Sequence, residues 1–173
     1  MENGLPTSYK LNDGTSIPSV GLGSMGNKDV ANITAAVMEA GYVHIDTAAM
    51  YGNEEQIGEA LQECFKQGKK REDVYITTKL FPTHSLNLIE SAKECLKKLQ
   101  LEKVDLMLLH HPLDKTNKKP MHLMWPEFEK MVDEGITTSI GVSNINTQLL
   151  YDLLQYARIK PVVNQIELNP QNS

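Results

Sequence analysis

The regular alternation of strand-like and helix-like segments is the feature that most constrains the fold of this 173-residue chain. Strands are predicted over residues 19–23, 42–46, 74–80, 104–110, 137–142 and 162–167. Helices are predicted between them, over residues 29–40, 54–67, 86–99, 124–134 and 148–158. Each strand–helix–strand step takes about thirty residues, the usual length of a βαβ unit. The alternation therefore predicts an α/β fold with a parallel sheet.

Glycines support the predicted element ends. Gly41, Gly68 and Gly135 follow three of the helices, where a left-handed residue is favoured. Before the first parallel strand, residues 9–20 contain two extended pieces separated by the turn sequence Asn12-Asp13-Gly14. An Asp-Gly pair suits the positive-φ positions of a tight hairpin turn. The sequence thus predicts an N-terminal β-hairpin followed by six parallel strands.

Two parallel architectures fit this pattern, a doubly wound open sheet and a (β/α) barrel. Glycines at positions 21, 23 and 26 come close to a dinucleotide-binding fingerprint. Such glycines are weak evidence by themselves. A dinucleotide-binding fold also uses an acidic residue at the end of its second strand to bind the ribose, and we assign that role to no residue of this sequence. A doubly wound dehydrogenase is therefore the less favoured interpretation.

Charge and cysteine content narrow the class of protein. The net charge is −5, whereas binding to nucleic acid or to an anionic membrane requires clustered positive charge. No apolar run is long enough to span a bilayer. Cys64 and Cys95 fall in helix-like segments without metal-ligand spacing. We expect a single cytoplasmic domain over residues 1–173, with no metal and no nucleic-acid or membrane partner.

Polar residues recur where the predicted strands end, which is where barrel enzymes place their catalytic groups. The second strand ends at Asp46, with Tyr51 in the following loop, the third ends with Lys79, and the fourth ends with His110. Each has a simpler explanation by itself. Asp46 could cap a helix and Tyr51 could be an ordinary loop aromatic. Lys79 could lie at the surface, and His110 could be a core histidine. Their recurrence at successive strand ends favours an active site.

These residue types suit one kind of chemistry. A tyrosine is a weak acid with an ordinary pKa near 10, and a neighbouring ammonium stabilises its phenolate. A carboxylate can hold that ammonium in place, and a histidine can hydrogen-bond a substrate oxygen. Together they could deliver a proton to a carbonyl oxygen whose carbon receives a hydride.

Six motifs in register along residues 9–170 resemble the aldo-keto reductase family. They are Leu11–Thr15 with Gly21–Gly23, Gly41–Ala48 with Tyr51–Glu54, Ile76–Leu80, Val104–Leu106 with Leu109–Pro112, Ser139–Asn144, and Asn164–Gln165 with Glu167. The resemblance implies a TIM-type (β/α)₈ barrel that binds NADPH and reduces aldehydes or ketones to alcohols. A full barrel has eight units, so we expect an incomplete barrel that lacks the last two.

The resemblance also implies roles for particular residues. Tyr51 would donate the proton, Lys79 and Asp46 would assist it, and His110 would orient the substrate carbonyl. The cofactor-binding residues would be Gly23, Ser24, Met25, Asp46, Ser143, Asn144 and Gln165. The substrate pocket would be lined by Met25, Tyr51, His110 and His111.

Several positions depart from the family pattern. Met25 and His111 stand where the family often has tryptophan, Ile145 replaces a frequent phenylalanine, and Asn169 replaces a frequent histidine. The departures predict a roomier or more polar pocket. Two open barrel edges also favour pairing with another chain. The alternative interpretation is a noncatalytic binding or structural module. Separately, two chains could complete each other's sheets by self-association through the open edges. Because the later loops that bind the adenosine phosphate in this family are missing, we also expect weakened NADPH affinity.

Overall fold

The computed structural model describes residues 6–82, 87–112 and 119–171. The described residues form eight strands, five α-helices and two short 3-10 helices. In chain order these are β1 (Ser8–Lys10), β2 (Ser16–Pro18), β3 (Leu22–Gly23), α1 (Val30–Met38), β4 (His44–Asp46), η1 (Ala49–Tyr51), α2 (Glu54–Lys66), η2 (Arg71–Asp73), β5 (Tyr75–Leu80), α3 (Leu88–Leu99), β6 (Val104–Leu109), α4 (Met121–Asp133), β7 (Thr137–Ser143), α5 (Thr147–Tyr156) and β8 (Asn164–Gln165).

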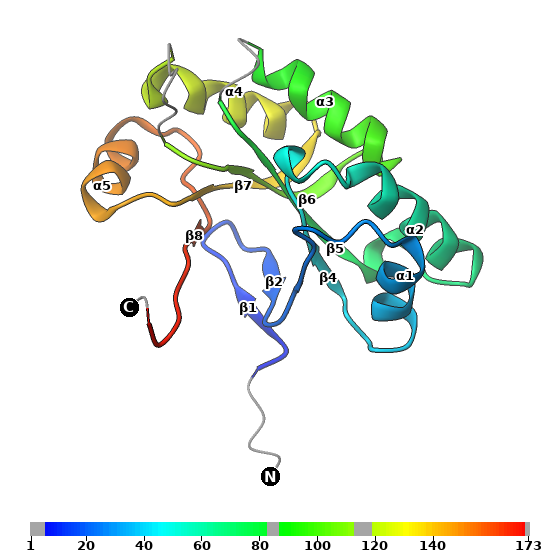
Figure 1. Ribbon diagram of the computed structural model, residues 1–173. Coiled ribbons are helices and arrows are strands. Elements are labelled where there is room, and N and C mark those ends of the chain that lie inside the picture. Colours follow the sequence, from blue (N-terminus) through cyan, green and yellow to red (C-terminus); the bar gives the residue numbers. More distant parts are fainter. Residues whose placement is uncertain (1–5, 83–86, 113–118, 172–173) are drawn as a thin grey trace.

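Six parallel strands form one sheet in the order β3-β4-β5-β6-β7-β8. Each strand pairs with its neighbours in the chain, whereas the strand order of a doubly wound sheet reverses at its centre. A constant direction of right-handed crossovers places every helix on one face of the sheet. Figure 1 shows the helices along the convex side of the curled sheet. The architecture is an incomplete barrel, as predicted, and the doubly wound alternative is wrong.

The central strands separate two kinds of side chain onto the two faces of the sheet. Successive residues of a strand point to opposite faces. Ile76, Met107 and Ile140 are buried in the hydrophobic cluster shared with the helices. Lys79 and Ser139, also buried, lie on the opposite, concave face. Because both faces of the sheet are covered, nearly every residue along these strands has low solvent exposure.

Helix α2 shows how the outer layer is built. Ile57, Leu61 and Cys64 recur at helical spacing and are buried. Glu54 and Glu55 lie in its first turn, where negative charge suits the helix dipole. Gly58 faces the end of α3, where an added Cβ would lie 2.4 Å from the carbonyl oxygen of Lys98. The close α2–α3 approach therefore requires glycine at position 58.

The N-terminal hairpin covers the amino end of the sheet (Figure 1). Gly14 has φ +89°, its amide donates to the Leu11 carbonyl at 3.1 Å, and the Leu11 amide donates to the Thr15 carbonyl at 2.8 Å. Asp13 is not among the residues with positive φ. The expectation that both Asp13 and Gly14 adopt positive φ is wrong. The turn instead places one left-handed glycine after an ordinary turn, as three-residue hairpin loops do.

Side chains of the hairpin turn attach it to the sheet. The Ser139 hydroxyl, near the start of β7, donates to the Asp13 carboxylate at 2.5 Å. The Asn12 side-chain amide donates to the Pro161 carbonyl at 3.0 Å. The hairpin is thus fixed at the end of the sheet opposite to the carboxyl ends of the strands.

Some element ends differ from the sequence prediction. Helix α4 begins at Met121 rather than at 124, because Met121, Met124 and Trp125 are buried together one turn earlier. Strand β8 covers only two residues rather than 162–167, because it pairs only with β7. The predicted start of the third helix at residue 86 lies outside the described residues. No helix in the described ranges is long and apolar enough to cross a membrane.

Candidate active site

Lys79 lies at the centre of a polar group at the carboxyl ends of β4 and β5. Its side chain is only 1% exposed, and lysine is almost never so buried unless it is paired. Its Nζ forms an ion pair with Asp46 Oδ1 and donates a hydrogen bond to the Thr47 carbonyl oxygen at 2.9 Å. The Tyr51 hydroxyl oxygen accepts a third hydrogen bond from Nζ at 3.4 Å. The three donors of the ammonium are thus directed at a carboxylate, a carbonyl and a phenol.

The chain is locally folded so that Tyr51 returns over this group. Tyr51 ends the 3-10 turn η1, and Gly52 then adopts a left-handed conformation with φ +62°. That conformation suits glycine and leads directly into α2. The sequence Tyr51-Gly52 therefore allows the tyrosine to face the sheet opening immediately before a helix that packs on the outer face.

His110 follows β6 and faces Tyr51. The two ring centroids are 5.8 Å apart and the rings are nearly perpendicular. Burial, and then the neighbouring Lys79 ammonium, lower the pKa of His110 to about 4. The imidazole is therefore neutral at physiological pH and retains one donor and one acceptor nitrogen. Phe81 packs edge-on against the same ring at 5.7 Å between centroids.

The ends of β7 and β8 contribute hydroxyl and amide groups. Asn144 has φ +59°, a left-handed conformation that asparagine tolerates better than most residues. Its backbone amide donates to the Gln165 carbonyl at 3.0 Å, and its side chain donates to the His110 carbonyl at 2.9 Å. The Ser143 hydroxyl also donates to the Gln165 carbonyl, at 2.9 Å.

Gln165 connects these two parts of the site. Its side-chain amide donates to Asp46 Oδ2 at 2.8 Å, although 119 positions separate the two residues. Asp46 therefore contacts Lys79 through one oxygen and Gln165 through the other. The structure brings together Asp46, Tyr51, Lys79, His110, Ser143, Asn144 and Gln165, all of them residues selected from the sequence.

The residues after β3 divide into two kinds. Ser24 is buried, and both its amide and its hydroxyl donate to the Asp46 carbonyl oxygen, at 3.0 and 2.8 Å. Met25 is 76% exposed, and a Cβ added at Gly23 would meet open space. His111 is half-buried beside Phe81, with 6.1 Å between ring centroids. Ser24 thus belongs to the polar group, whereas Met25 lies at its open margin.

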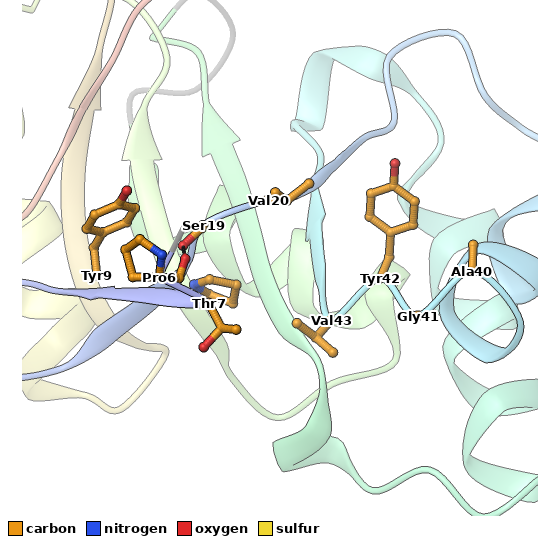
Figure 2. Close-up of a pocket in the computed structure, with 10 residues that line it drawn as sticks. Pro6, Thr7, Tyr9, Ser19, Val20, Ala40, Gly41, Tyr42 and Val43 are labelled. Atoms are coloured by element: carbon orange, nitrogen blue, oxygen red, sulfur yellow. Dashed lines mark hydrogen bonds between the residues drawn. The ribbon is translucent and has the colours of Figure 1, made fainter. Parts of the chain in front are cut away.

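A cavity of about 510 Å³ lies at the other end of the sheet. In Figure 2 the hairpin side chains of Pro6, Thr7 and Tyr9 lie on one side of it, and the turn from Ala40 to Val43 lies on the other. Its walls precede β3 and β4, so they lie at the amino ends of the strands. None of the candidate site residues lines it. Despite its size, we do not interpret it as the active site.

The sequence and the fold match a known family. A family model described as "Aldo/keto reductase family" matches residues 11–173. The chain belongs to the aldo/keto reductase family. Among its curated relatives, aldose reductase C of Dictyostelium discoideum is 42% identical over 192 residues, covering 94% of this chain and 59% of the relative. D-galacturonate reductase of Hypocrea jecorina is 39% identical, covering 95% of this chain and 60% of the relative.

Solved aldo/keto reductase structures share the fold. One from Brucella melitensis is 40% identical with a TM-score of 0.87, covering 96% of this chain and 64% of that chain. One from Bombyx mori, in complex with NADP, is 36% identical with a TM-score of 0.86, covering 94% and 58%. The sequence thus spans about 60% of the length of the family members it matches.

Proposed function

We propose that this chain carries the proton-donating group of an NADPH-dependent reductase that converts aldehydes or ketones to alcohols. One observation supports this most strongly. A fully buried ammonium, Lys79, contacts both a carboxylate, Asp46, and the hydroxyl of a tyrosine, Tyr51, that faces the open end of the sheet. A buried charge is costly unless it is paired, and packing alone does not require one here.

The chemistry follows from the contacts of these side chains. NADPH, when bound, supplies the hydride that adds to the carbonyl carbon. The Tyr51 hydroxyl gives its proton to the carbonyl oxygen, so that the alcohol carries one new C–H and one new O–H bond. The phenolate left behind is stabilised by the Lys79 ammonium. Asp46 holds that ammonium in place, and neutral His110 hydrogen-bonds the carbonyl oxygen.

The residues present suit a nicotinamide ring. Ser143, Asn144 and Gln165 place a hydroxyl and two side-chain amides next to His110 and Asp46. Side-chain amides both donate and accept, which matches the carboxamide of the ring. The open space at Gly23 leaves room beside Ser24 for a ribose. We infer that these residues hold the nicotinamide half of the cofactor.

Turnover with the Tyr51→Phe variant tests this proposal. NADPH oxidation by the 173-residue chain would be measured with a reactive aromatic aldehyde. Loss of a general acid should lower kcat by about 10²- to 10⁴-fold. Tyr151→Phe, at an exposed position in α5, is the matched control and should keep its turnover. A folded Tyr51→Phe variant with full turnover would exclude Tyr51 as the proton donor.

A second function, a noncatalytic binding or structural module, is favoured by the edges of the sheet. In the described part of the chain, β3 and β8 each have a partner on one side only. Exposed apolar side chains accompany both edges, with Val20 before β3 and Ile166 and Leu168 after β8. Open edges promote pairing with another chain. We therefore propose self-association through these edges.

Sedimentation at increasing protein concentration measures whether the chain associates with itself, and so tests the second proposal. A folded parent chain without turnover, together with association weakened by Ile166→Ser and Leu168→Ser, would favour the module over the reductase. A strictly monomeric chain would contradict self-association.

The cytoplasmic location stays a prediction.

A further inference from the structure

Asn53 differs from the aspartate and asparagines that precede three of the other helices. Asparagine and aspartate before a helix usually accept a hydrogen bond from one of its first amides, which contributes about 1 kcal/mol. Asp29, Asn87 and Asn146 cap α1, α3 and α5 in this way. Asn53 precedes α2 but makes no such cap. Its side chain is directed elsewhere, at a cost to the stability of the helix.

The Asn53 side chain makes three hydrogen bonds inside the protein. Its Nδ2 donates to the Ser24 carbonyl oxygen at 2.7 Å and to the Asn27 carbonyl oxygen at 2.9 Å. Its Oδ1 accepts from the Thr47 hydroxyl at 2.8 Å. The residue is 0% exposed. Asn53 therefore joins the loop after β3 to the chain that leaves β4.

Both connections lead to the buried ion pair. Ser24 donates its amide and its hydroxyl to the Asp46 carbonyl oxygen. The Thr47 carbonyl oxygen accepts a hydrogen bond from Lys79 Nζ at 2.9 Å. One residue, Gly52, separates Asn53 from Tyr51. The buried side-chain amide of Asn53 thus holds in place the segments that contact the Lys79 ammonium. It also fixes the end of the loop that carries Tyr51.

We propose that Asn53 is a positioning residue that holds the Tyr51 hydroxyl at hydrogen-bond distance from the Lys79 ammonium. The consequence for turnover rests on the proposed reductase function, but the positioning itself does not. Glu54 supports the same loop from the outer face, where its buried carboxylate accepts a hydrogen bond from the Thr78 hydroxyl at 2.6 Å. Misplacing a reacting group by about 1 Å can lower a rate about a hundredfold.

Thr47→Val is the deciding variant because it removes one hydroxyl donor to Asn53 and keeps the shape of the side chain. Thr47→Ser keeps the hydroxyl and should restore the parent behaviour. Thr34→Val is the matched control, since the buried Thr34 hydroxyl has no hydrogen-bond partner within the described residues. We expect kcat to fall about tenfold in Thr47→Val and further in Asn53→Ala, with the KM for the aldehyde changed less than about threefold.

A spectroscopic measurement separates positioning from catalysis. The chain has six tyrosines, and with ¹³C-labelled tyrosine the Tyr51 ring resonance is identified by its loss in Tyr51→Phe. That resonance should move in Thr47→Val and stay in place in Thr47→Ser and Thr34→Val. If Asn53→Ala does not fold, Thr47→Val decides alone.

Two outcomes have different meanings. An unmoved Tyr51 resonance in folded Thr47→Val would overturn the positioning role. A moved resonance, together with full turnover of Tyr51→Phe, would support the positioning role and refute the proton-donor proposal.

Discussion

The two faces of strand β5 differ in polarity, although one buried hydroxyl, that of Thr78, also lies on the outer face. On the outer face, Ile76 and Leu80 are buried in the hydrophobic cluster with the helices. On the inner face, Thr77 and Lys79 are equally buried but polar. The inner side also holds more buried polar atoms without a hydrogen-bond partner in the described part of the chain: His44 Nδ1 and the Tyr75 hydroxyl, against the Thr34 hydroxyl in the outer layer. The difference indicates that the outer face stabilises the fold, whereas the inner face keeps costly groups for chemistry.

Truncation of Ile76 should have the largest effect on stability. Ile76→Ala removes a side chain that is 0% exposed and leaves a cavity, so we expect a loss of about 2–5 kcal/mol in the free energy of unfolding. Its inner-face counterpart, Thr77→Ala, removes the hydroxyl that contacts His44 Nε2 at 2.9 Å and should cost about 1 kcal/mol. Urea titration measures both. Equal losses would contradict the contrast between the faces.

Gly58→Ala should have the next largest effect. Alanine normally stabilises a helix relative to glycine. Here the added Cβ meets the Lys98 backbone at 2.4 Å, so we expect a loss of about 1–3 kcal/mol from overpacking between α2 and α3. Glu59→Ala, at an exposed position of the same helix, is the control for the urea titration. A stabilised Gly58→Ala variant would show that the outer layer adjusts more easily than we infer.

The outer face was largely predictable from the sequence because its signals are local. Strand and helix order, and the glycines after three helices, follow from periodicity and backbone preference. Gly41, Gly68 and Gly135 have positive φ, as predicted. Helix α3, however, ends with Gln100 at φ +55°, and no sequence signal marked that residue. The Gln100 amide donates to the Lys97 carbonyl oxygen at 3.2 Å, so this helix ends without the glycine that would have marked its end in the sequence.

For the inner face, the sequence predicted which residues lie there but not which of them contact one another. Strand ends identified Asp46, Lys79 and His110 because catalytic groups of barrels collect there. The contact between Gln165 and Asp46 depends on the curl of the whole sheet, which no local pattern encodes. Sequence reasoning assigned no role to Asn53. The resemblance included it among the matched residues, but its type before a helix suggested an ordinary cap.

Acid should weaken the inner face more than the outer one. Burial lowers the pKa of His44, and burial with the Lys79 ammonium lowers that of His110 from 6.5 to about 4. As the pH falls below 6.5, the unfolded histidines bind protons before the folded ones. The stability contributed by neutral histidines is therefore complete above pH 6.5 and is lost toward pH 4.

Variants isolate that contribution from other groups. Burial raises the pKa of Glu54, which acts in the opposite direction, so only the difference between variants is informative. The fall in stability between pH 6.5 and 4, measured by urea titration, should be shallower in His110→Gln than in the parent chain. His122→Gln, at an exposed position of α4, should keep the parent slope. Identical slopes in all three would mean that His110 titrates as it does in the unfolded chain.

The smallest change in stability is expected where the loss of function is greatest. Replacing a buried ion pair with uncharged groups of similar shape is often neutral for stability, whereas removing one partner is costly. Asp46→Asn combined with Lys79→Met should therefore change the free energy of unfolding by no more than about 1 kcal/mol. Lys79→Met alone should destabilise the protein more. The Asp46 carboxylate contacts Lys79 and Gln165, and this variant leaves it with Gln165 but without a positive charge beside it.

Turnover should show the opposite pattern. The double variant lacks the ammonium beside Tyr51, so we expect NADPH oxidation to fall by about two orders of magnitude or more, even though the fold is retained. A double variant that is several kcal/mol less stable than the parent chain would mean that the ion pair stabilises the fold. In that case Lys79 would belong with Ile76, and the two faces of β5 would not differ in their contribution to stability.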